Sequence, residues 1–146
     1  MSFQLSYTST LANVSTAVKQ VAEHCRRHAA ATPGQDLIVE QVELCVAEAL
    51  TNVVKHAYDG RETETFHVAC NASGRQIVVD IIDRGKELPE SALEQTELQP
   101  FSCDLNDLPE SGFGWFIILE QMDSVSYRRE AGTNFLTLTK QLARPA

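Results

Sequence analysis

The sequence of 146 residues has little of what marks membrane, disulfide-stapled or nucleic-acid-binding proteins. No apolar run approaches the roughly 18 to 20 residues that a membrane span requires, and the first residues show neither the basic nor the apolar region of a secretory signal. The four cysteines form no CxxC pair, which disfavours a zinc knuckle and a disulfide framework. A formal charge of −8 disfavours binding to nucleic acid or anionic lipid. We therefore expect a soluble, cytoplasmic protein that binds neither nucleic acid nor membranes.

Length and composition favour one compact domain. Hydrophobic residues make up 43% of the chain and charged residues 22%, which is typical of a globular protein with a core of its own. The sequence shows no internal repeat, low-complexity tract or linker. We expect a single domain over residues 1–146.

Alternating and helical spacings of apolar residues predict the order of the elements. That order is strand, helix, helix, strand, strand, a long irregular segment, helix, strand and strand. The corresponding ranges are 3–8, 10–32, 35–57, 65–70, 76–83, 84–111, 114–122, 124–130 and 134–142. Neighbouring strands with intervening helices indicate an α+β fold. We expect a two-layer sandwich in which one mixed, mostly antiparallel sheet carries its helices on one face.

The second predicted helix carries an acid, an amide and a cation in one row. Glu48 and Asn52 are four residues apart and Lys55 follows three residues later, so their side chains emerge from one face. Asparagine is a mediocre helix former, which favours a functional reason for Asn52. A row of polar residues is also the ordinary solvent-facing side of an amphipathic helix, so both interpretations stay open on this motif alone.

Two further motifs place polar or flexible residues at the ends of elements. Asp83 stands where an apolar strand stops and Gly85 follows it; this is either a carboxylate that accepts from an exocyclic amine or an ordinary Asx turn. Gly112 and Gly114 precede an apolar stretch, and glycines before a helix either approach phosphate oxygens or act as a hinge. The irregular segment before them, about 86–111, is long enough to be a functional lid.

The order and spacing of these motifs resemble the ATP-binding module of GHKL-type proteins, which has a Bergerat-type fold. Within that superfamily the chain is similar to the anti-sigma factor serine kinases of bacterial partner-switching systems. The similarity runs from roughly Phe3 to Leu142 and is carried by VAEALTNVVKHAY, DIIDRGKELPE, PFS, SGFGWFIILEQMDSVSYRRE and GTNFLTLTK.

The resemblance implies a role for each motif residue. Glu48 takes the place of the catalytic carboxylate, Asn52 that of the magnesium-binding amide, and Asp83 that of the adenine-reading aspartate. The resemblance also implies nucleotide-binding positions for Lys55, Gly85, Ser111, Gly112, Phe113, Gly114 and Thr133. A departure from the family pattern is Glu110, which places negative charge beside the glycine lid.

The implied function is that of an ATP- and magnesium-dependent protein-serine kinase. Such a protein phosphorylates a STAS-domain anti-sigma factor antagonist, sequesters a sigma factor or analogous regulator, and forms a homodimer. The alternative is a non-catalytic nucleotide-binding module of the same fold that acts by sequestration alone. A third interpretation, the catalytic module of a sensor histidine kinase, is disfavoured because the sequence shows no phospho-accepting histidine helix.

Overall fold

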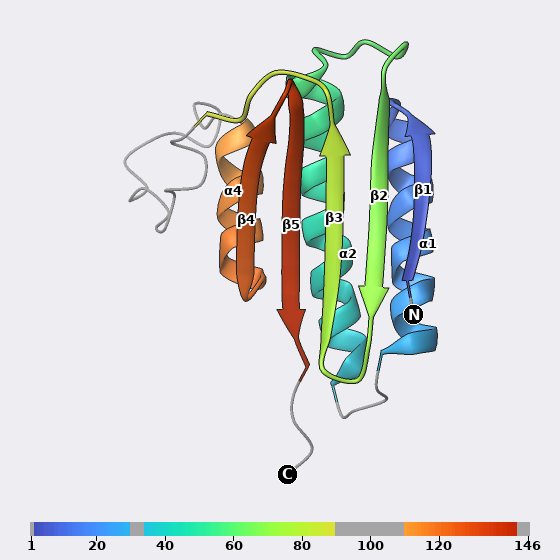
Figure 1. Ribbon diagram of the computed structural model, residues 1–146. Helices are drawn as coiled ribbons and strands as arrows, with labels where there is room; N and C mark the ends of the chain where they lie inside the picture. The colour runs from blue at the N-terminus through green and yellow to red at the C-terminus, as the bar shows by residue number, and fades with distance from the viewer. Residues whose placement is uncertain (1, 30–33, 90–109, 143–146) are drawn as a thin grey trace.

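The computed structural model describes residues 2–29, 34–89 and 110–142, with side chains from Gly114 onward in the last segment. A five-stranded sheet carries the helices on one face, and the other face is uncovered by the described residues (Figure 1). The elements are β1 Ser2–Thr8, α1 Leu11–His28, α2 Gln35–Asn52, η1 Val53–Ala57, β2 Thr65–Ala72, β3 Gln76–Asp83, α4 Glu110–Gln121, β4 Ser124–Glu130 and β5 Thr133–Gln141. The predicted element order and the α+β sandwich are confirmed.

The strand order brings the end of β3 against the start of β5. The sheet runs β1-β2-β3-β5-β4, and each of its pairs is antiparallel, so the sheet is wholly antiparallel where a mixed, mostly antiparallel one was predicted. After β3 the chain passes through α4 and β4, and β5 then returns between β3 and β4. The register places Asp83 of β3 opposite Asn134 of β5.

The core lies between the sheet and the helices. Burial alternates along β3, where every second residue from Ile77 to Asp83 is buried, as expected for a strand with one face on a core. Helices α1, α2 and α4 contribute the other side, including Val21, Leu50 and Ile118, all fully buried. Burying side chains of this size stabilises the fold by about 1.5–3 kcal/mol each. No helix among the described residues is long and apolar enough to cross a bilayer.

The second predicted helix is an α-helix to Asn52 and changes to a π-helix over its last five residues. Val53–Ala57 form a π turn, in which the backbone N–H of Tyr58 donates to the carbonyl of Val53 at 2.9 Å. The predicted helix from Gln35 to Ala57 is therefore confirmed in its bounds, and its last turn is a π turn. Single π turns inside helices occur frequently at functional sites, and this one begins directly after Asn52.

The helix that follows the irregular segment begins earlier than predicted. It starts at Glu110 rather than Gly114, so Gly112 and Gly114 lie inside the helix and the prediction that they precede it is wrong. Glycine costs a helix about 1 kcal/mol relative to alanine. Burial of Trp115, Ile118 and Met122 against the core offsets that cost. The predicted lid, 86–111, lies for the most part outside the described residues.

Candidate active site

Glu48 and Asn52 lie on the last turns of α2, which packs beside α4 on the helical face of the sheet. The end of α2, the first turn of α4, the end of β3 and the start of β5 all lie at the top of Figure 1. Glu48 and Asn52 are both half-buried, and four residues on a helix place their side chains one above the other. The structure therefore brings together the helix motif, the strand-end motif and the glycine motif at one end of the molecule.

Gly114 lies directly against these two side chains. A Cβ atom built on Gly114 would be 2.9 Å from Oε2 of Glu48 and 3.5 Å from Nδ2 of Asn52. Gly114 itself is buried. Glycine is thus required here by close approach, because a larger residue would displace the Glu48 carboxylate.

Asn52 has an unsatisfied polar atom at this point. Its Nδ2 is buried and has no hydrogen-bond partner among the described residues. A buried amide atom without a partner costs about 1–3 kcal/mol, so native proteins rarely keep one without a reason. The two ends of an asparagine amide are assigned from their surroundings. As assigned, Asn52 offers a donor to an anion, and with the amide reversed it offers an oxygen ligand to a cation.

Asp83 is buried at the end of β3, with 6% of its surface exposed. Its Oδ1 accepts from the backbone N–H of Gly85 at 2.8 Å and from Nδ2 of Asn134 at 2.8 Å. Burial raises the pKa of the Asp83 carboxyl above its ordinary value, and the Asn134 and Gly85 hydrogen bonds and the Arg129 charge oppose that rise. The bond from Gly85 closes an Asx turn. The motif is therefore a turn in the structure, and its carboxylate is buried as well.

Gly85 permits the close approach of the β3 end to η1. A Cβ atom at Gly85 would be 2.4 Å from the carbonyl oxygen of Ala57 and 2.5 Å from its carbon. The backbone N–H of Lys86 donates to the same oxygen at 2.9 Å. The glycine predicted beside Asp83 therefore joins the strand end to the π turn that follows Asn52.

The remaining predicted residues belong to elements at the same end of the molecule. Lys55 is exposed on η1. Thr133 is the first residue of β5 and pairs with Glu130, and its neighbour Asn134 rather than Thr133 donates to Asp83. Ser111, Gly112 and Phe113 fall in the first turn of α4, where their side chains lie outside the described residues.

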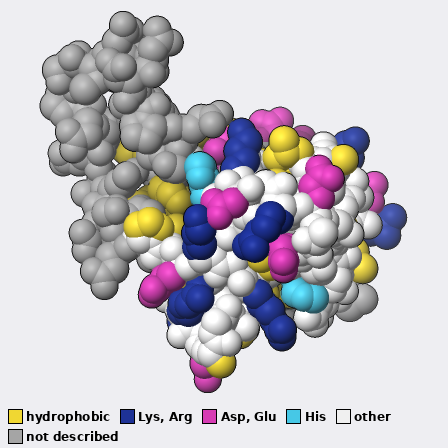
Figure 2. All heavy atoms as spheres, turned by 90° about the horizontal axis from the view of Figure 1, so that it is seen from above, with side chains coloured by type: hydrophobic (Ala, Val, Ile, Leu, Met, Phe, Trp, Pro, Cys, Tyr) yellow, Lys and Arg dark blue, Asp and Glu magenta, His cyan; other side chains and the backbone are white. Residues whose placement is uncertain are grey.

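The surface at this end is less acidic than the chain as a whole. Figure 2, which views the molecule from this end, shows basic and acidic side chains interspersed. Six exposed cations belong to η1, to the loop before β2 and to the ends of β3 and β4: Lys55, Arg61, Arg84, Lys86, Arg128 and Arg129. They are half of the 12 Lys and Arg in the sequence. Two of them are paired with acids, Lys86 with Asp59 at 2.7 Å and Arg128 with Glu130 at 2.6 Å. This end therefore repels an anionic ligand less than the net charge of −8 suggests.

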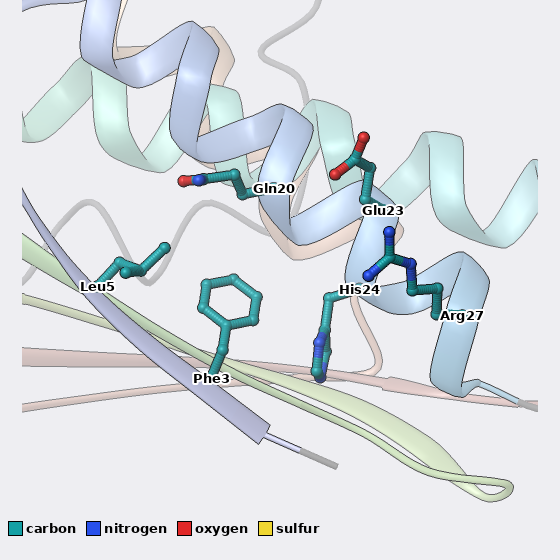
Figure 3. Close-up of a pocket in the computed structure, with 6 residues that line it drawn as sticks. All are labelled: Phe3, Leu5, Gln20, Glu23, His24 and Arg27. Carbon is teal, nitrogen blue, oxygen red and sulfur yellow. The ribbon is translucent and has the colours of Figure 1, made fainter.

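A shallow pocket on another part of the molecule contains none of the predicted residues. It lies between β1 and α1 and is lined by Phe3, Leu5, Gln20, Glu23, His24 and Arg27 (Figure 3). Phe3 contacts the ring of His24 edge-on at 4.9 Å between centroids. Because β1 is the edge strand farthest from β4, this pocket is separate from the candidate active site.

Asn134 is a site residue that the sequence analysis did not identify. It is 3% exposed and shares the buried face of β5 with Leu136 and Leu138. The available signal was its position in the alternation, because a polar residue on a buried strand face must find partners inside the protein.

Comparisons with known proteins agree on one family. The family model described as "Histidine kinase-like ATPase domain" matches residues 7–140. The chain is 34% identical over 108 residues to the serine-protein kinase RsbW of Halalkalibacterium halodurans, which covers 73% of this chain and 64% of that protein. It is 33% identical to the serine/threonine-protein kinase BtrW of Bordetella bronchiseptica, over 68% of each chain. It is 27% identical to the anti-sigma F factor of Clostridium beijerinckii, over 70% of each. The matches span about two thirds of these relatives.

Solved structures show the same fold at lower identity. The RsbU and RsbW domains of Rv1364c from Mycobacterium tuberculosis match with a TM-score of 0.61 at 19% identity, over 99% of this chain and 34% of that one. The SiaB–SiaC complex from Pseudomonas aeruginosa matches with a TM-score of 0.56 at 16% identity, over 96% of this chain and 89% of that one.

Proposed function

Because the chain belongs to the family of histidine kinase-like ATPase domains, we propose that it is a protein-serine kinase that uses ATP and magnesium. Its substrate is a STAS-domain anti-sigma factor antagonist. Phosphorylation releases the antagonist, and the kinase then sequesters a sigma factor or an analogous regulator. The names of the relatives, serine-protein kinase and anti-sigma F factor, support both halves of the proposal.

The observation that carries this proposal is the cluster of Glu48, Asn52 and Gly114. The Glu48 carboxylate lies near the Asn52 amide, whose buried Nδ2 has no hydrogen-bond partner among the described residues. Gly114 lets α4 pack directly against both side chains. The cluster fits a site for a metal-bound phosphate, because an amide NH₂ donates to phosphate oxygens and an amide oxygen coordinates a cation. When bound, magnesium neutralises charge on the transferring phosphate.

Phosphoryl transfer requires little covalent chemistry from the protein. Phosphoryl transfer depends mostly on positioning and on charge stabilisation, and we assign Glu48 as the group that accepts the proton of the attacking serine hydroxyl. The serine oxygen forms a bond to the γ-phosphorus as the bond between that phosphorus and the β,γ-bridging oxygen breaks. ADP leaves with the electron pair of that bond, and the proton stays on Glu48 until it is passed to water.

The remaining assignments belong to the same proposal. Asn52 holds magnesium, and Asp83 accepts from the exocyclic amine of adenine. Further nucleotide contacts come from Lys55, Gly85, Ser111, Gly112, Phe113, Gly114 and Thr133. Residues 86–111 act as the lid of a single domain that covers 1–146. We place the protein in the cytoplasm, as a homodimer.

The proposal is tested with purified protein, magnesium and ATP labelled on the γ-phosphate. Candidate STAS-domain proteins from the same genome are added one at a time, and labelled protein is hydrolysed to identify the modified amino acid. We expect label on serine of one partner. Label on histidine of any protein, or none on a partner that forms a stable complex, contradicts the kinase assignment.

The alternative of sequestration without catalysis makes a different prediction for Glu48→Ala. Under the kinase proposal this variant binds ATP and loses transfer. Under sequestration alone, its control of the regulator equals that of the wild type.

A further inference from the structure

We propose that Asn134 is a positioning residue that holds Asp83 so that Oδ2 of its carboxylate is left to read the nucleobase. Asn134 would thereby set the preference for a base with an exocyclic amine. This inference rests on the proposed nucleotide site, but it concerns a residue to which neither the family motif nor the comparisons give a role.

The hydrogen bonds on Asp83 are distributed unevenly between its two oxygens. The backbone N–H of Gly85 and Nδ2 of Asn134 both donate to Oδ1, each at 2.8 Å. Within residues 2–29, 34–89 and 114–142, no group is recorded as donating to Oδ2. An ionised carboxylate has about four acceptor positions. The oxygen without a protein donor is therefore the one available to a ligand amine.

The direction of the Asn134 amide is fixed from both of its ends. Arg129 Nη1 donates to Oδ1 of Asn134 at 2.8 Å, and the hydroxyl of Tyr127 donates to the same oxygen at 2.7 Å. Arginine has donors only, so the amide oxygen must face Arg129. The NH₂ group must then face Asp83 and the carbonyl oxygens of Gly85 and Lys86, which it approaches at 3.2 Å and 3.0 Å.

The same side chains hold the backbone that follows Asp83. Arg129 Nη1 also donates to the carbonyl oxygen of Gly85 at 3.0 Å. The hydroxyl of Tyr127 accepts from the backbone N–H of Leu88 at 3.0 Å. Asn134 thus bonds both to the Asp83 carboxylate and to the carbonyl oxygens of the two residues Gly85 and Lys86 that follow it. A carboxylate held in this way is oriented before a ligand arrives.

A second cross-strand pair between β3 and β5 offers a matched control. Thr137 donates to Oδ1 of Asp80 at 2.6 Å, and these residues are also opposite each other in the register. They lie three residues from Asp83 and Asn134 on the same strands, so their side chains are on the other face of the sheet. Thr137→Val removes a comparable bond without touching Asp83.

The test compares the affinities for ADP and for inosine diphosphate, whose base has a carbonyl oxygen in place of the amine. Dissociation constants are measured by titration calorimetry on folded protein. For the wild type we expect ADP to bind on the order of 10- to 100-fold more tightly, the value of one hydrogen bond to a charged group. Asn134→Ala should lower this ratio roughly tenfold, chiefly by weakening ADP. Thr137→Val should keep the wild-type ratio.

If Asn134 has a purely structural role, Asn134→Ala weakens the binding of both nucleotides equally and leaves the ratio of affinities unchanged. That result would overturn the inference. If Asn134→Ala does not fold, Arg129→Met carries the test, because Arg129 is exposed and its loss frees one end of the amide. We then expect the ratio to fall at least about threefold, and an unchanged ratio again overturns the inference. A wild type that binds ADP and inosine diphosphate equally also overturns it. A wild type that binds no nucleotide contradicts the proposed function itself.

Discussion

Gly114→Ala separates stability from catalysis at the proposed site. The new methyl group would be 2.9 Å from Oε2 of Glu48, whereas ordinary contacts of this kind begin at 3.4 Å. The Glu48 carboxylate is the end of a flexible side chain, so it moves by roughly 0.5 Å or more while the backbone stays in place. A misplacement of about 1 Å in a catalytic group costs on the order of 100-fold in rate. We therefore expect the rate of phosphoryl transfer to fall about 10- to 100-fold.

The same substitution should leave the fold intact. Alanine is favoured over glycine inside a helix by about 1 kcal/mol, which offsets the displacement of Glu48, so the free energy of unfolding should change by less than about 1 kcal/mol. Transfer is measured in single turnovers with labelled ATP and the STAS partner, and stability by urea unfolding. The matched control is Gly34→Ala, far from the site at the start of α2. Gly34 has a φ of 87° and open space around it, so alanine there should cost about 1–2 kcal/mol of stability and no activity. Wild-type transfer by Gly114→Ala would refute the assignment of Glu48.

Three further predictions concern the junction between β3 and η1. Gly85→Ala places a Cβ atom 2.4 Å from the backbone oxygen of Ala57, which cannot move aside cheaply; we expect a loss of about 1–3 kcal/mol in urea unfolding. Asp83→Asn keeps the Oδ1 acceptor but puts a donor where Oδ2 stands, so ADP binding should be lost in calorimetry. Because burial raises the pKa of Asp83, its ionisation opposes folding: its contribution to stability is greatest below the unfolded pKa and falls as pH rises through the folded pKa. The stability of Asp83→Asn relative to the wild type should therefore increase as pH rises through that range, and a constant difference would contradict it. Tyr58→Phe removes a buried hydroxyl that bonds a backbone carbonyl and a backbone N–H, each at 2.7 Å; we expect a loss of about 1–3 kcal/mol in urea unfolding.

Much of the fold was predictable because strong periodic patterns decide it. The strand predicted at 76–83 has those bounds in the structure, since a continuous alternation specifies which face is buried. The helix starting near Thr10 was also predictable, because the Thr10 side chain accepts from the backbone N–H of Asn13 at 3.1 Å, as expected of an N-cap.

The details of the site depended on tertiary contacts that a sequence pattern does not contain. The π turn at Val53–Ala57 has the apolar spacing of an α-helix, and it is visible in the backbone bond from Tyr58 to Val53. The start of α4 at Glu110 contradicts local propensity, because packing against the core overrides two glycines. Gly114 does lie against Glu48 and Asn52, and Gly85 lies against Ala57 of the turn that follows Asn52. Their roles remain predictions.

The most direct test of the account is a single-turnover experiment on Glu48→Gln. The variant and the wild type are mixed with magnesium, labelled ATP and the serine-bearing STAS partner, and nucleotide binding is measured on the same samples. We expect equal ATP affinity, within about threefold, and a loss of serine labelling of at least about 100-fold, as for removal of a general base. Serine labelling at the wild-type rate by Glu48→Gln would show that the cluster on α2 binds nucleotide without carrying the reaction.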